Sequence, residues 1–565
     1  MSINHSMYEE TVERAKKLFL DGWIVSLGLS GKDSGAASIC VVEGLKRALV
    51  VNPNVGPLYV VTTNTTLDNM VLHEYMMDLH DDLNKYASDT SMPIFTKELR
   101  PTLASNPMVE YIGRGKLLRT PQTASKGRDC AEDWKVKPME RFLKSLQQKH
   151  QTTKVVSISG ARDSESTARA VNLKKRNESA TQVVATGLGW TQAIIKDWSL
   201  NDVWQLFKVV DDCEIDSYSD RFDAMRKHYS AGNGGTCDLF AGIQNNKECG
   251  ARFGCVLCAM NPTDRSLEAQ LEVSPKTYGF MKPLNELRTY MINTLFDYSK
   301  RSLLGREMKD GFIKVGINQY SLEYRMDLLR YVLTIQQDAF DRYGYHPIDL
   351  VDYRELLAIQ YHWSREGGEP EPGMALKIWH EIVVEGTGRY PIPQTEKIEA
   401  AFTPLYTYFP LEDYMDKDNS IGLDDEGLYG KYKHLARVYY REGIKHQVIK
   451  YDESNAFEVV TENSKAMMFV DSFYPDLVEG GYLENKCPTV MLKHLLESGV
   501  VRIAKGSIDR LNRDAKRAQA LFSLRTTTGV PVDEAILRLS VPKKLKNRVL
   551  EITENTSQTA LDLIL

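Results

Sequence analysis

A short segment near the N-terminus combines the residue types that hold phosphate groups. It contains two serines, a glycine, a lysine and an aspartate, namely Ser30, Gly31, Lys32, Asp33 and Ser34. Hydroxyl groups, an ammonium group and backbone N–H groups that glycine leaves approachable are all donors to a bound anion. The apolar run 23–29 predicts a strand, and the residues after it predict a helix that begins near Asp33. Because a helix N-terminus adds unpaired N–H groups, we expect an anion site here, with an ordinary polar turn as the alternative.

The spacing of this segment differs from that of the Walker A phosphate loop. That motif needs glycine at position 26 and serine or threonine at position 33, where this sequence has Ser26 and Asp33. The segment is therefore not predicted to be the phosphate loop of a P-loop nucleotidase.

Half of the cysteines form a second group of residues that could take part in chemistry. Four of the eight lie in one short stretch, at Cys237, Cys249, Cys255 and Cys258. Four thiols without a neighbouring histidine are a soft ligand set that suits an iron–sulfur cluster or zinc. A zinc ribbon usually has two Cys-x2-Cys pairs, whereas only the last two cysteines of this stretch have that spacing. We expect a [4Fe–4S] cluster, with zinc or unligated buried cysteines as the alternatives.

A further cysteine, Cys130, lies between Arg128 and Lys135. Nearby positive charges favour the thiolate, which is the nucleophilic form of cysteine. Cys130 is therefore a candidate sulfur carrier or a thiol that serves the cluster, and a buried structural cysteine is the alternative.

Two arginines, Arg162 and Arg169, follow the apolar run 154–159. The planar guanidinium fork matches the spacing of two phosphate oxygens. We expect these arginines to bind phosphate, and the alternative is an ion pair with Asp163 or Glu165.

Strand-like and helix-like runs alternate through the first part of the chain. The predicted strands are 23–29, 58–63 and 154–159, and the predicted helices are 34–49, 68–84 and 137–148. Such alternation predicts an α/β fold with a doubly wound parallel sheet, in which ligands bind at the carboxyl ends of the strands. The loop that holds Ser30–Ser34 follows the first strand and is therefore at that edge.

The length of 565 residues predicts several domains. We expect a nucleotide-binding domain over 1–230, a cysteine-rich segment over 231–283, a helical domain over 284–365 and a mostly helical domain over 374–565. The break before the last domain is the run Glu366-Gly-Gly-Glu-Pro-Glu-Pro-Gly373.

The net charge of −5 gives no overall indication of nucleic-acid binding, so any DNA contact must use local basic surfaces. The best candidate is a predicted helix over 507–524, which has an apolar stripe and, on another face, Arg510, Arg513 and Arg517. A second basic run, Lys543-Lys-Leu-Lys-Asn-Arg548, follows it. The alternative for both is a solvated basic surface.

No window of the sequence approaches a transmembrane helix, and the N-terminal residues lack the apolar core of a signal peptide. We therefore expect a cytoplasmic protein with no membrane contact.

Several motifs occur in the order that is typical of one family. After the Ser30–Ser34 loop come Tyr111-Ile-Gly-Arg-Gly115, Arg128-Asp-Cys-Ala-Glu-Asp-Trp-Lys135, Ser159-Gly-Ala-Arg162, Asp197-Trp-Ser-Leu-Asn-Asp-Val-Trp204 and Arg252-Phe-Gly-Cys-Val-Leu-Cys258. The chain thereby resembles, over roughly residues 8–360, the phosphoadenosine-phosphosulfate-reductase superfamily of ATP pyrophosphatases. Within it, the sequence is most similar to the sulfur-transfer components of DNA phosphorothioation systems of the Dnd or Ssp type. It departs from the family where the loop has one glycine fewer, and where Asn64 replaces an acidic residue after the second strand.

The resemblance implies cleavage of ATP, bound with Mg²⁺, to AMP and pyrophosphate. The AMP would activate a DNA backbone phosphate for sulfur incorporation in a system that modifies DNA and defends against phage. The implied catalytic residues are Lys32, Asp33, Cys130 and Arg162, and the ATP site would comprise Ser30, Gly31, Lys32, Asp33, Ser34, Arg162 and Arg169. The implied partners are DNA, a cysteine desulfurase as sulfur donor and other phosphorothioation proteins.

Three other functions agree with parts of the sequence. A reductase of phosphoadenosine phosphosulfate and a transfer-RNA thiolase would share the fold. A nucleic-acid-binding module that holds zinc and lacks catalysis would share only the cysteines. ATP turnover separates the enzymes from the module, and sulfur analysis of DNA separates the enzymes from each other.

Overall fold

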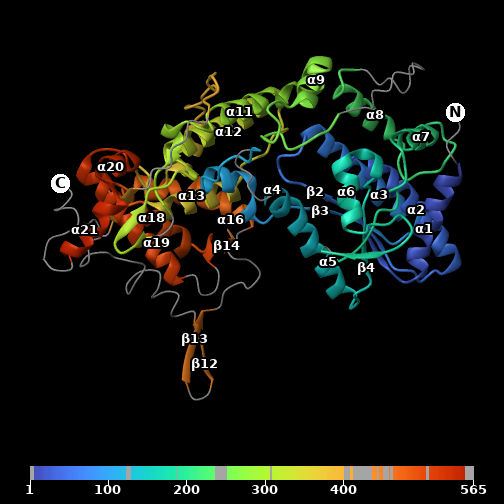
Figure 1. The fold of residues 1–565 in the computed structure, drawn as a ribbon, viewed down its shortest axis with the longest axis horizontal. Coiled ribbons are helices and arrows are strands. Elements are labelled where there is room, and N and C mark those ends of the chain that lie inside the picture. Colours follow the sequence, from blue (N-terminus) through green and yellow to red (C-terminus); the bar gives the residue numbers. More distant parts are fainter. Residues whose placement is uncertain are drawn as a thin grey trace. The chain divides into compact units, whose positions relative to one another are not determined.

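The structure of the protein is a computed structural model, shown in Figure 1. It describes residues 5–121, 129–187, 189–235, 251–305, 308–399, 407–411, 436–441, 444–449, 457–458, 462–503 and 508–553. The chain divides into two compact units. Unit 1 comprises 1–101 and 119–285, and unit 2 comprises 102–118 and 286–565.

A six-stranded sheet forms the centre of unit 1, in the order β3-β2-β1-β4-β6-β5. Its strands are β1 (Ile24–Gly28), β2 (Leu58–Thr63), β3 (Ile94–Leu99), β4 (Val155–Ile158), β5 (Val184–Thr186) and β6 (Gly189–Gln192). All neighbouring strands are parallel except β5 and β6, which form an antiparallel pair. The three strands predicted from the sequence are confirmed as β1, β2 and β4, and the unit is an α/β fold as expected.

Helices pack on both faces of this sheet. Val25 and Leu27 of β1 join one apolar cluster with side chains of α1 (His5–Leu20), α2 (Lys32–Val51), α3 (Met70–Thr90), α7 (Leu200–Asp211) and α8 (Phe222–Ala231). Ile24, on the other face of β1, packs in a second cluster with Phe142 and Leu146 of α5 (Lys137–Lys149). Burial of alternate residues of one strand in two different clusters is the pattern of a sheet covered on both sides.

Unit 2 combines a helical part with a small antiparallel sheet. Its long helices include α12 (Leu322–Tyr343), α13 (Tyr353–Glu366) and α19 (Ile508–Thr528). The sheet has the order β16-β11-β9-β8 and is built from β8 (Met308–Lys309), β9 (Phe312–Lys314), β11 (Thr407–Phe409) and β16 (Val541–Pro542). Ile313 and Phe409 of this sheet pack against Leu521 of α19.

No helix among the described residues is both long enough and apolar enough to cross a membrane.

Candidate active site

The order of strands places two loops of unit 1 at a topological switch point. From β1 the chain continues to β2 on one side, whereas β4 lies on the other side of β1 and leads away to β6. The loops after β1 and β4 are therefore neighbours at the carboxyl edge of the sheet, at the kind of position where α/β proteins bind ligands. The loop after β1 carries Ser30–Ser34, and the loop after β4 carries Arg162.

The Ser34 hydroxyl closes the loop after β1. Its Oγ accepts hydrogen bonds from the N–H groups of Ser30 (2.9 Å) and Gly31 (3.1 Å), and it donates to the Gly31 carbonyl at 3.0 Å. Two successive N–H groups thus point at one oxygen at the start of α2. Amides aimed at a single oxygen at a helix N-terminus are the arrangement that binds a phosphate oxygen.

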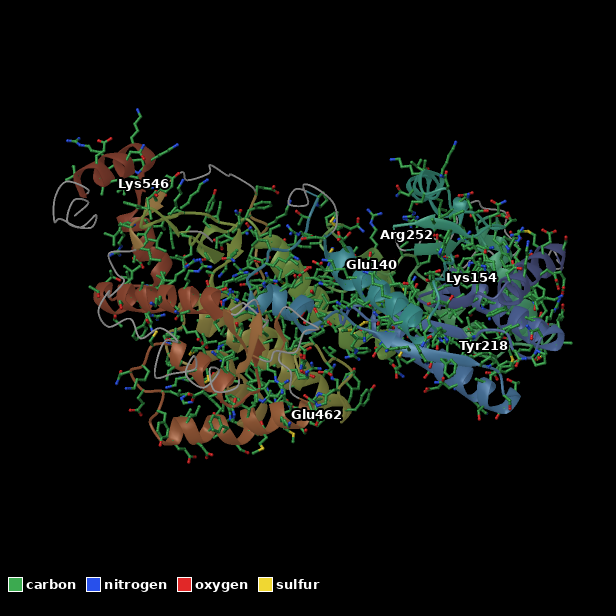
Figure 2. The ribbon with its side chains drawn as sticks, turned by 90° about the horizontal axis from the view of Figure 1, so that it is seen from below. Glu140, Lys154, Tyr218, Arg252, Glu462 and Lys546 are labelled. Atoms are coloured by element: carbon green, nitrogen blue, oxygen red, sulfur yellow. The ribbon has the colours of Figure 1, made fainter. Side chains whose placement is uncertain are left out.

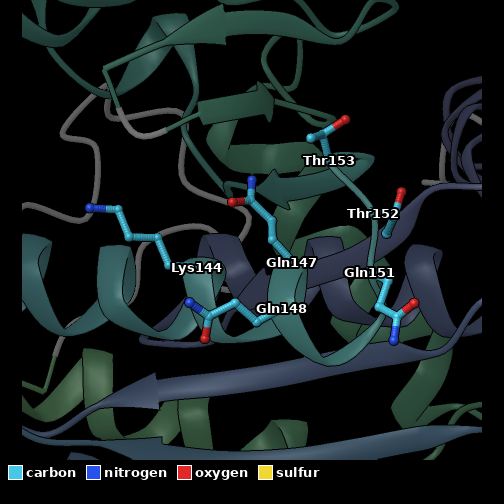
Figure 3. A pocket seen from close by; sticks show the side chains of 6 residues that line it. All are labelled: Lys144, Gln147, Gln148, Gln151, Thr152 and Thr153. Atoms are coloured by element: carbon cyan, nitrogen blue, oxygen red, sulfur yellow. The ribbon is translucent and has the colours of Figure 1, made fainter.

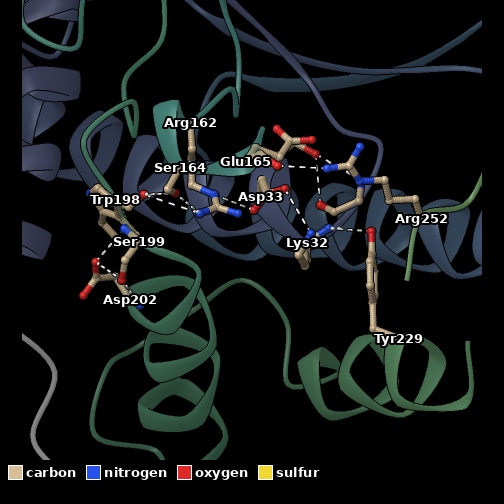
Figure 4. Close-up of polar contacts among 12 residues, drawn as sticks. Lys32, Asp33, Arg162, Ser164, Glu165, Trp198, Ser199, Asp202, Tyr229 and Arg252 are labelled. Carbon is tan, nitrogen blue, oxygen red and sulfur yellow. Dashed lines mark hydrogen bonds and ion pairs between the residues drawn. The ribbon is translucent and has the colours of Figure 1, made fainter. Parts of the chain in front are cut away.

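The Asp33 carboxylate forms ion pairs with Lys32 and Arg162, two of the cations predicted to bind phosphate (Figure 4). Its Oδ1 accepts from Arg162 Nε at 2.8 Å, and its Oδ2 accepts from Lys32 Nζ at 3.2 Å. Asp33 therefore holds charges from two different loops in one place. Charges fixed in advance in this way stabilise a transition state without reorganisation during the reaction.

Arg162 is buried, with 2% of its surface exposed, and its contacts fix the plane of the guanidinium. Besides Asp33, its Nη1 donates to Ser164 Oγ at 2.7 Å and to the Trp198 carbonyl at 3.4 Å. Neither Asp163 nor Glu165, the partners considered in the sequence analysis, pairs with Arg162 among the described residues. The remaining Nη2 group has no partner in the described part of the chain, and it is the group available to a phosphate oxygen.

Tyr229 of α8 contacts the loop from the opposite side to Asp33 in Figure 4. The Lys32 ammonium lies 4.8 Å from the centre of the Tyr229 ring, and the Lys32 N–H donates to the Tyr229 hydroxyl at 3.5 Å. The Tyr229 ring also packs edge-on against Phe253, at 5.1 Å between ring centres. Since Phe253 precedes Cys255 by two residues, Tyr229 connects the phosphate loop with the cysteine segment. No sequence pattern indicates this role of Tyr229, because it depends on the packing of α8.

Two positions in this site require glycine, because neighbouring atoms come too close to leave room for a Cβ atom. A Cβ atom at Gly31 would lie 2.8 Å from the Tyr229 hydroxyl, and one at Gly160 would lie 2.5 Å from the Ser34 backbone nitrogen. The second contact is with main chain, which cannot rotate away. Gly160 was part of a motif noted in the sequence, but its role emerges only when β4 is placed beside β1.

We expect Gly160→Ala to separate the two loops and to lower the rate of ATP cleavage by roughly tenfold or more, with a loss of about 1–3 kcal/mol in stability from overpacking. Gly279→Ala is the matched control, because nothing lies within 4 Å of its added Cβ. Steady-state kinetics and urea unfolding of both variants would check this expectation. Equal activity of the two variants would contradict the close approach.

Cys255 and Cys258 are also held at the carboxyl edge of the sheet. The Val256 N–H donates to the Leu67 carbonyl at 2.6 Å, and Cys255 Sγ lies 3.6 Å from Thr65 Oγ1, both in the loop after β2. The Cys258 N–H donates to the Cys255 carbonyl at 2.8 Å, which closes a tight turn between the two thiols. The phosphate loop and the loop that contacts this thiol pair thus follow neighbouring strands, β1 and β2.

A lysine and an aspartate lie beside the thiol pair. Lys135 forms an ion pair with Asp68 at 3.2 Å. Burial opposes the charge on Lys135, but Asp68 and the Cys255 and Cys258 sulfurs outweigh it and raise the pKa of the ammonium. Burial, together with the Asp68 charge, raises the pKa of the Cys255 thiol to about 12. A thiol with such a raised pKa is neutral unless a metal stabilises its thiolate.

The described cysteines fit half of the predicted metal site. A Cys-x2-Cys turn is a ligand pair for an iron–sulfur cluster and equally for zinc. Cys237 and Cys249 lie outside the described residues. In the part of the chain that the structure describes, no group of three or more His, Cys, Asp and Glu side chains is placed to hold a metal.

Cys130 lies in a helical segment that precedes α5. Its N–H donates to Asp129 Oδ1 at 3.1 Å, and its side chain is half-buried. Cys130 and Lys135 belong to successive turns, α4 (Asp129–Ala131) and the π-helical turn η3 (Glu132–Val136). Lys135 therefore approaches both Asp68 and the thiol pair from the turn that follows the one carrying Cys130. Arg128 and the side chain of Arg169 lie outside the described residues.

Asn64, which replaces the acidic residue usual in the family, contacts a carboxylate from the next strand. Its Nδ2 donates to Glu98 Oε1 at 2.6 Å, and His73 and Arg100 also contact Glu98. Burial would raise the pKa of Glu98, but hydrogen bonds from His73, Arg100 and Asn64 outweigh it and lower the pKa to about 2. A permanent negative charge therefore lies beside Asn64, supplied by β3 instead of β2.

A shallow pocket of about 360 Å³ lies elsewhere in unit 1 (Figure 3). Its lining consists of Lys144, Gln147, Gln148, Gln151, Thr152 and Thr153. These residues connect the end of α5 to the start of β4, so the pocket is at the amino edge of the sheet. It is not part of the candidate site.

In comparisons with known proteins, the chain matches no protein-family model and no curated protein sequence.

Proposed function

We propose that the protein is an ATP pyrophosphatase that adenylates a backbone phosphate of DNA so that sulfur can replace one of its oxygens. The observation that carries this proposal is the network in which Asp33 joins Lys32 and the buried Arg162 between the loops after β1 and β4. The Cys255–Cys258 pair, held on the loop after the neighbouring strand, supports the link to sulfur chemistry.

The proposed site handles the charge of the triphosphate. ATP enters as its Mg²⁺ complex, so the metal arrives with the substrate. The N–H groups of Ser30 and Gly31 exchange the Ser34 hydroxyl for an oxygen of the leaving pyrophosphate, beside the Lys32 ammonium, and Arg162 Nη2 faces the phosphorus under attack. An oxygen of the DNA phosphate bonds to the α phosphorus of ATP, and the bond between the α phosphorus and the bridging oxygen of pyrophosphate breaks.

The second stage exchanges oxygen for sulfur. An iron–sulfur cluster, when bound, would supply a redox-active and thiophilic centre beside this stage. A cysteine desulfurase places a sulfane sulfur on Cys130, and the terminal sulfur of this persulfide attacks the activated phosphorus. AMP leaves with the oxygen atom. A second thiol then cleaves the S–S bond and leaves a disulfide, which an external thiol must reduce.

Cys130→Ser tests this assignment. The variant should keep ATP cleavage and any colour of the cluster, because neither depends on this thiol, and it should lose sulfur transfer to DNA completely. The measurement is digestion of DNA to nucleotides and mass spectrometry of phosphorothioate dinucleotides after incubation with ATP, desulfurase and cysteine.

Cys213→Ser is the matched control, since Cys213 is an exposed cysteine of the same unit. Sulfur transfer by Cys130→Ser at the wild-type rate would remove Cys130 from the mechanism. Loss of the cluster colour in Cys130→Ser would make Cys130 a cluster ligand, and Cys237 would then be the carrier.

A further inference from the structure

The C-terminal helices of unit 2 carry a basic surface that is separate from the ATP site. Helix α20 (Val532–Leu539) and helix α21 (Lys543–Thr553) are joined by only three residues, Ser540, Val541 and Pro542. The last two of these residues are the strand β16, which pairs with β11, so α21 leaves directly from the small antiparallel sheet. Figure 1 shows both helices with α19 in the C-terminal part of the chain.

One face of α21 is fixed on the small antiparallel sheet. Val549 is buried with Phe312 and Val541, and Lys546 lies over the rings of Phe312 (5.4 Å) and Tyr408 (5.0 Å). Lys546, labelled in Figure 2, also pairs with Asp310 at 3.1 Å. Because these contacts fix the rotation of α21 about its axis, they determine which residues face outward.

The outward face of α21 is basic over its first two turns, before the exposed Glu551. Lys544 and Arg548 are exposed and lie four residues apart, on the side of the helix opposite to Lys546 and Val549. Lys543 is exposed in the first turn. None of these three cations has an ion-pair partner among the described residues.

The strands β8 and β9 add further positive charge beside α21. Lys309 pairs in register with Phe312, and Lys314 pairs with Tyr408, so both lysines lie on the sheet face that α21 covers. Both are exposed. A hairpin and a helix thus place five cations on one surface of a chain whose net charge is −5.

Helix α19, which the sequence indicated as the best candidate for DNA binding, has a less continuous basic surface than α21. Its apolar stripe is confirmed, since Leu511, Ala515, Ala518 and Leu521 are buried. Arg517 donates to the Gly305 carbonyl at 2.8 Å, and Asp514 pairs with Arg365, so the row of arginines is interrupted by internal contacts. Arg510 and Arg513 remain exposed.

We infer that the surface formed by Lys309, Lys314, Lys543, Lys544 and Arg548 binds double-stranded DNA, with α21 in the major groove and the β8–β9 hairpin on the phosphate backbone. The choice of DNA rests on the proposed function. Double-stranded DNA is favoured because binding of single strands uses exposed aromatic rings, and the described residues of this surface include none. Asn547, exposed between Lys544 and Arg548, adds a side chain that reads base edges.

The test is fluorescence anisotropy of a labelled 30-base-pair duplex with the full chain, without ATP, across a range of salt concentrations. Lys544→Gln/Arg548→Gln should weaken binding by roughly 10- to 100-fold and reduce the slope of log K against log salt by about 2. Lys465→Gln/Lys486→Gln removes the same charge from exposed sites elsewhere in unit 2 and should change neither quantity appreciably.

Several outcomes would overturn the inference: no duplex binding by the wild type, tighter binding of single strands or RNA, or loss of binding in Arg510→Gln/Arg513→Gln but not in the α21 variant. Release of pyrophosphate measured at saturating DNA concentration should be unchanged in the α21 variant. A failure of the ATP reaction in the wild type would count against the proposed function alone, because duplex binding is measured without it.

Discussion

Asp33→Asn should lower the rate of ATP cleavage by on the order of 10³-fold while the protein stays folded. The amide keeps the shape of the side chain and can still accept a hydrogen bond from Arg162 Nε, so we expect a change of only about 1–2 kcal/mol in stability. It removes the negative charge that holds Lys32 and Arg162 together across two loops. Misplaced cations no longer match the charge that develops at phosphorus. Coupled detection of pyrophosphate would measure the rate, and circular dichroism would follow unfolding.

Asp163→Asn is the control for this prediction. Asp163 follows Arg162 in the same loop, is about half exposed, and pairs with Lys196 at 3.8 Å. We expect this variant to cleave ATP at the wild-type rate. If both variants kept full activity, the Asp33 network would have no role in the reaction.

The second large effect concerns the thiol pair. Protein purified without oxygen should be brown, with about four iron atoms per chain if the cluster is a cubane. Cys255→Ser or Cys258→Ser should abolish the colour and most of the bound iron. Stability should also fall, because ligand binding to the metal contributes free energy of folding.

Iron analysis and visible absorption would check this prediction, with Cys213→Ser as a control that keeps both. A colourless wild type with one zinc per chain would reject the iron–sulfur cluster and favour the zinc alternative. A chain without either metal would leave Cys255 as a buried neutral thiol, in accordance with its raised pKa.

The local parts of the candidate site were predictable from sequence because they depend on short-range signals. The apolar run before Ser30 and the polar residues after it determine a strand, a loop and a helix, and these form as β1 and α2. The strand β3 was not predicted, because its residues Ile94–Leu99 are mixed, with Phe95 exposed and two charged side chains. Such a strand lies at the edge of the sheet, where one side of its backbone has no neighbour.

The long-range parts of the site were not predictable. Arg162 was expected to bind phosphate or to pair with a neighbour in sequence, but its partner Asp33 is 129 residues away. Tyr229 and Gly160 contact the loop only because α8 and β4 pack beside it. Lys135 was expected to act on Cys130, but its ion pair is with Asp68 in the loop after β2. Sequence spacing gives no information on such contacts, because they are determined by how the strands are ordered in the sheet.

The most direct test of the central claim is the identity of the products formed from ATP. The protein would be incubated with ATP labelled at the α phosphate, with Mg²⁺, DNA, a cysteine desulfurase, cysteine and a reducing thiol, and the products would be separated by chromatography. The proposed chemistry predicts labelled AMP, with one pyrophosphate released for each AMP, and no such products from Asp33→Asn. Labelled ADP with free phosphate as the main products would contradict the assignment as an ATP pyrophosphatase.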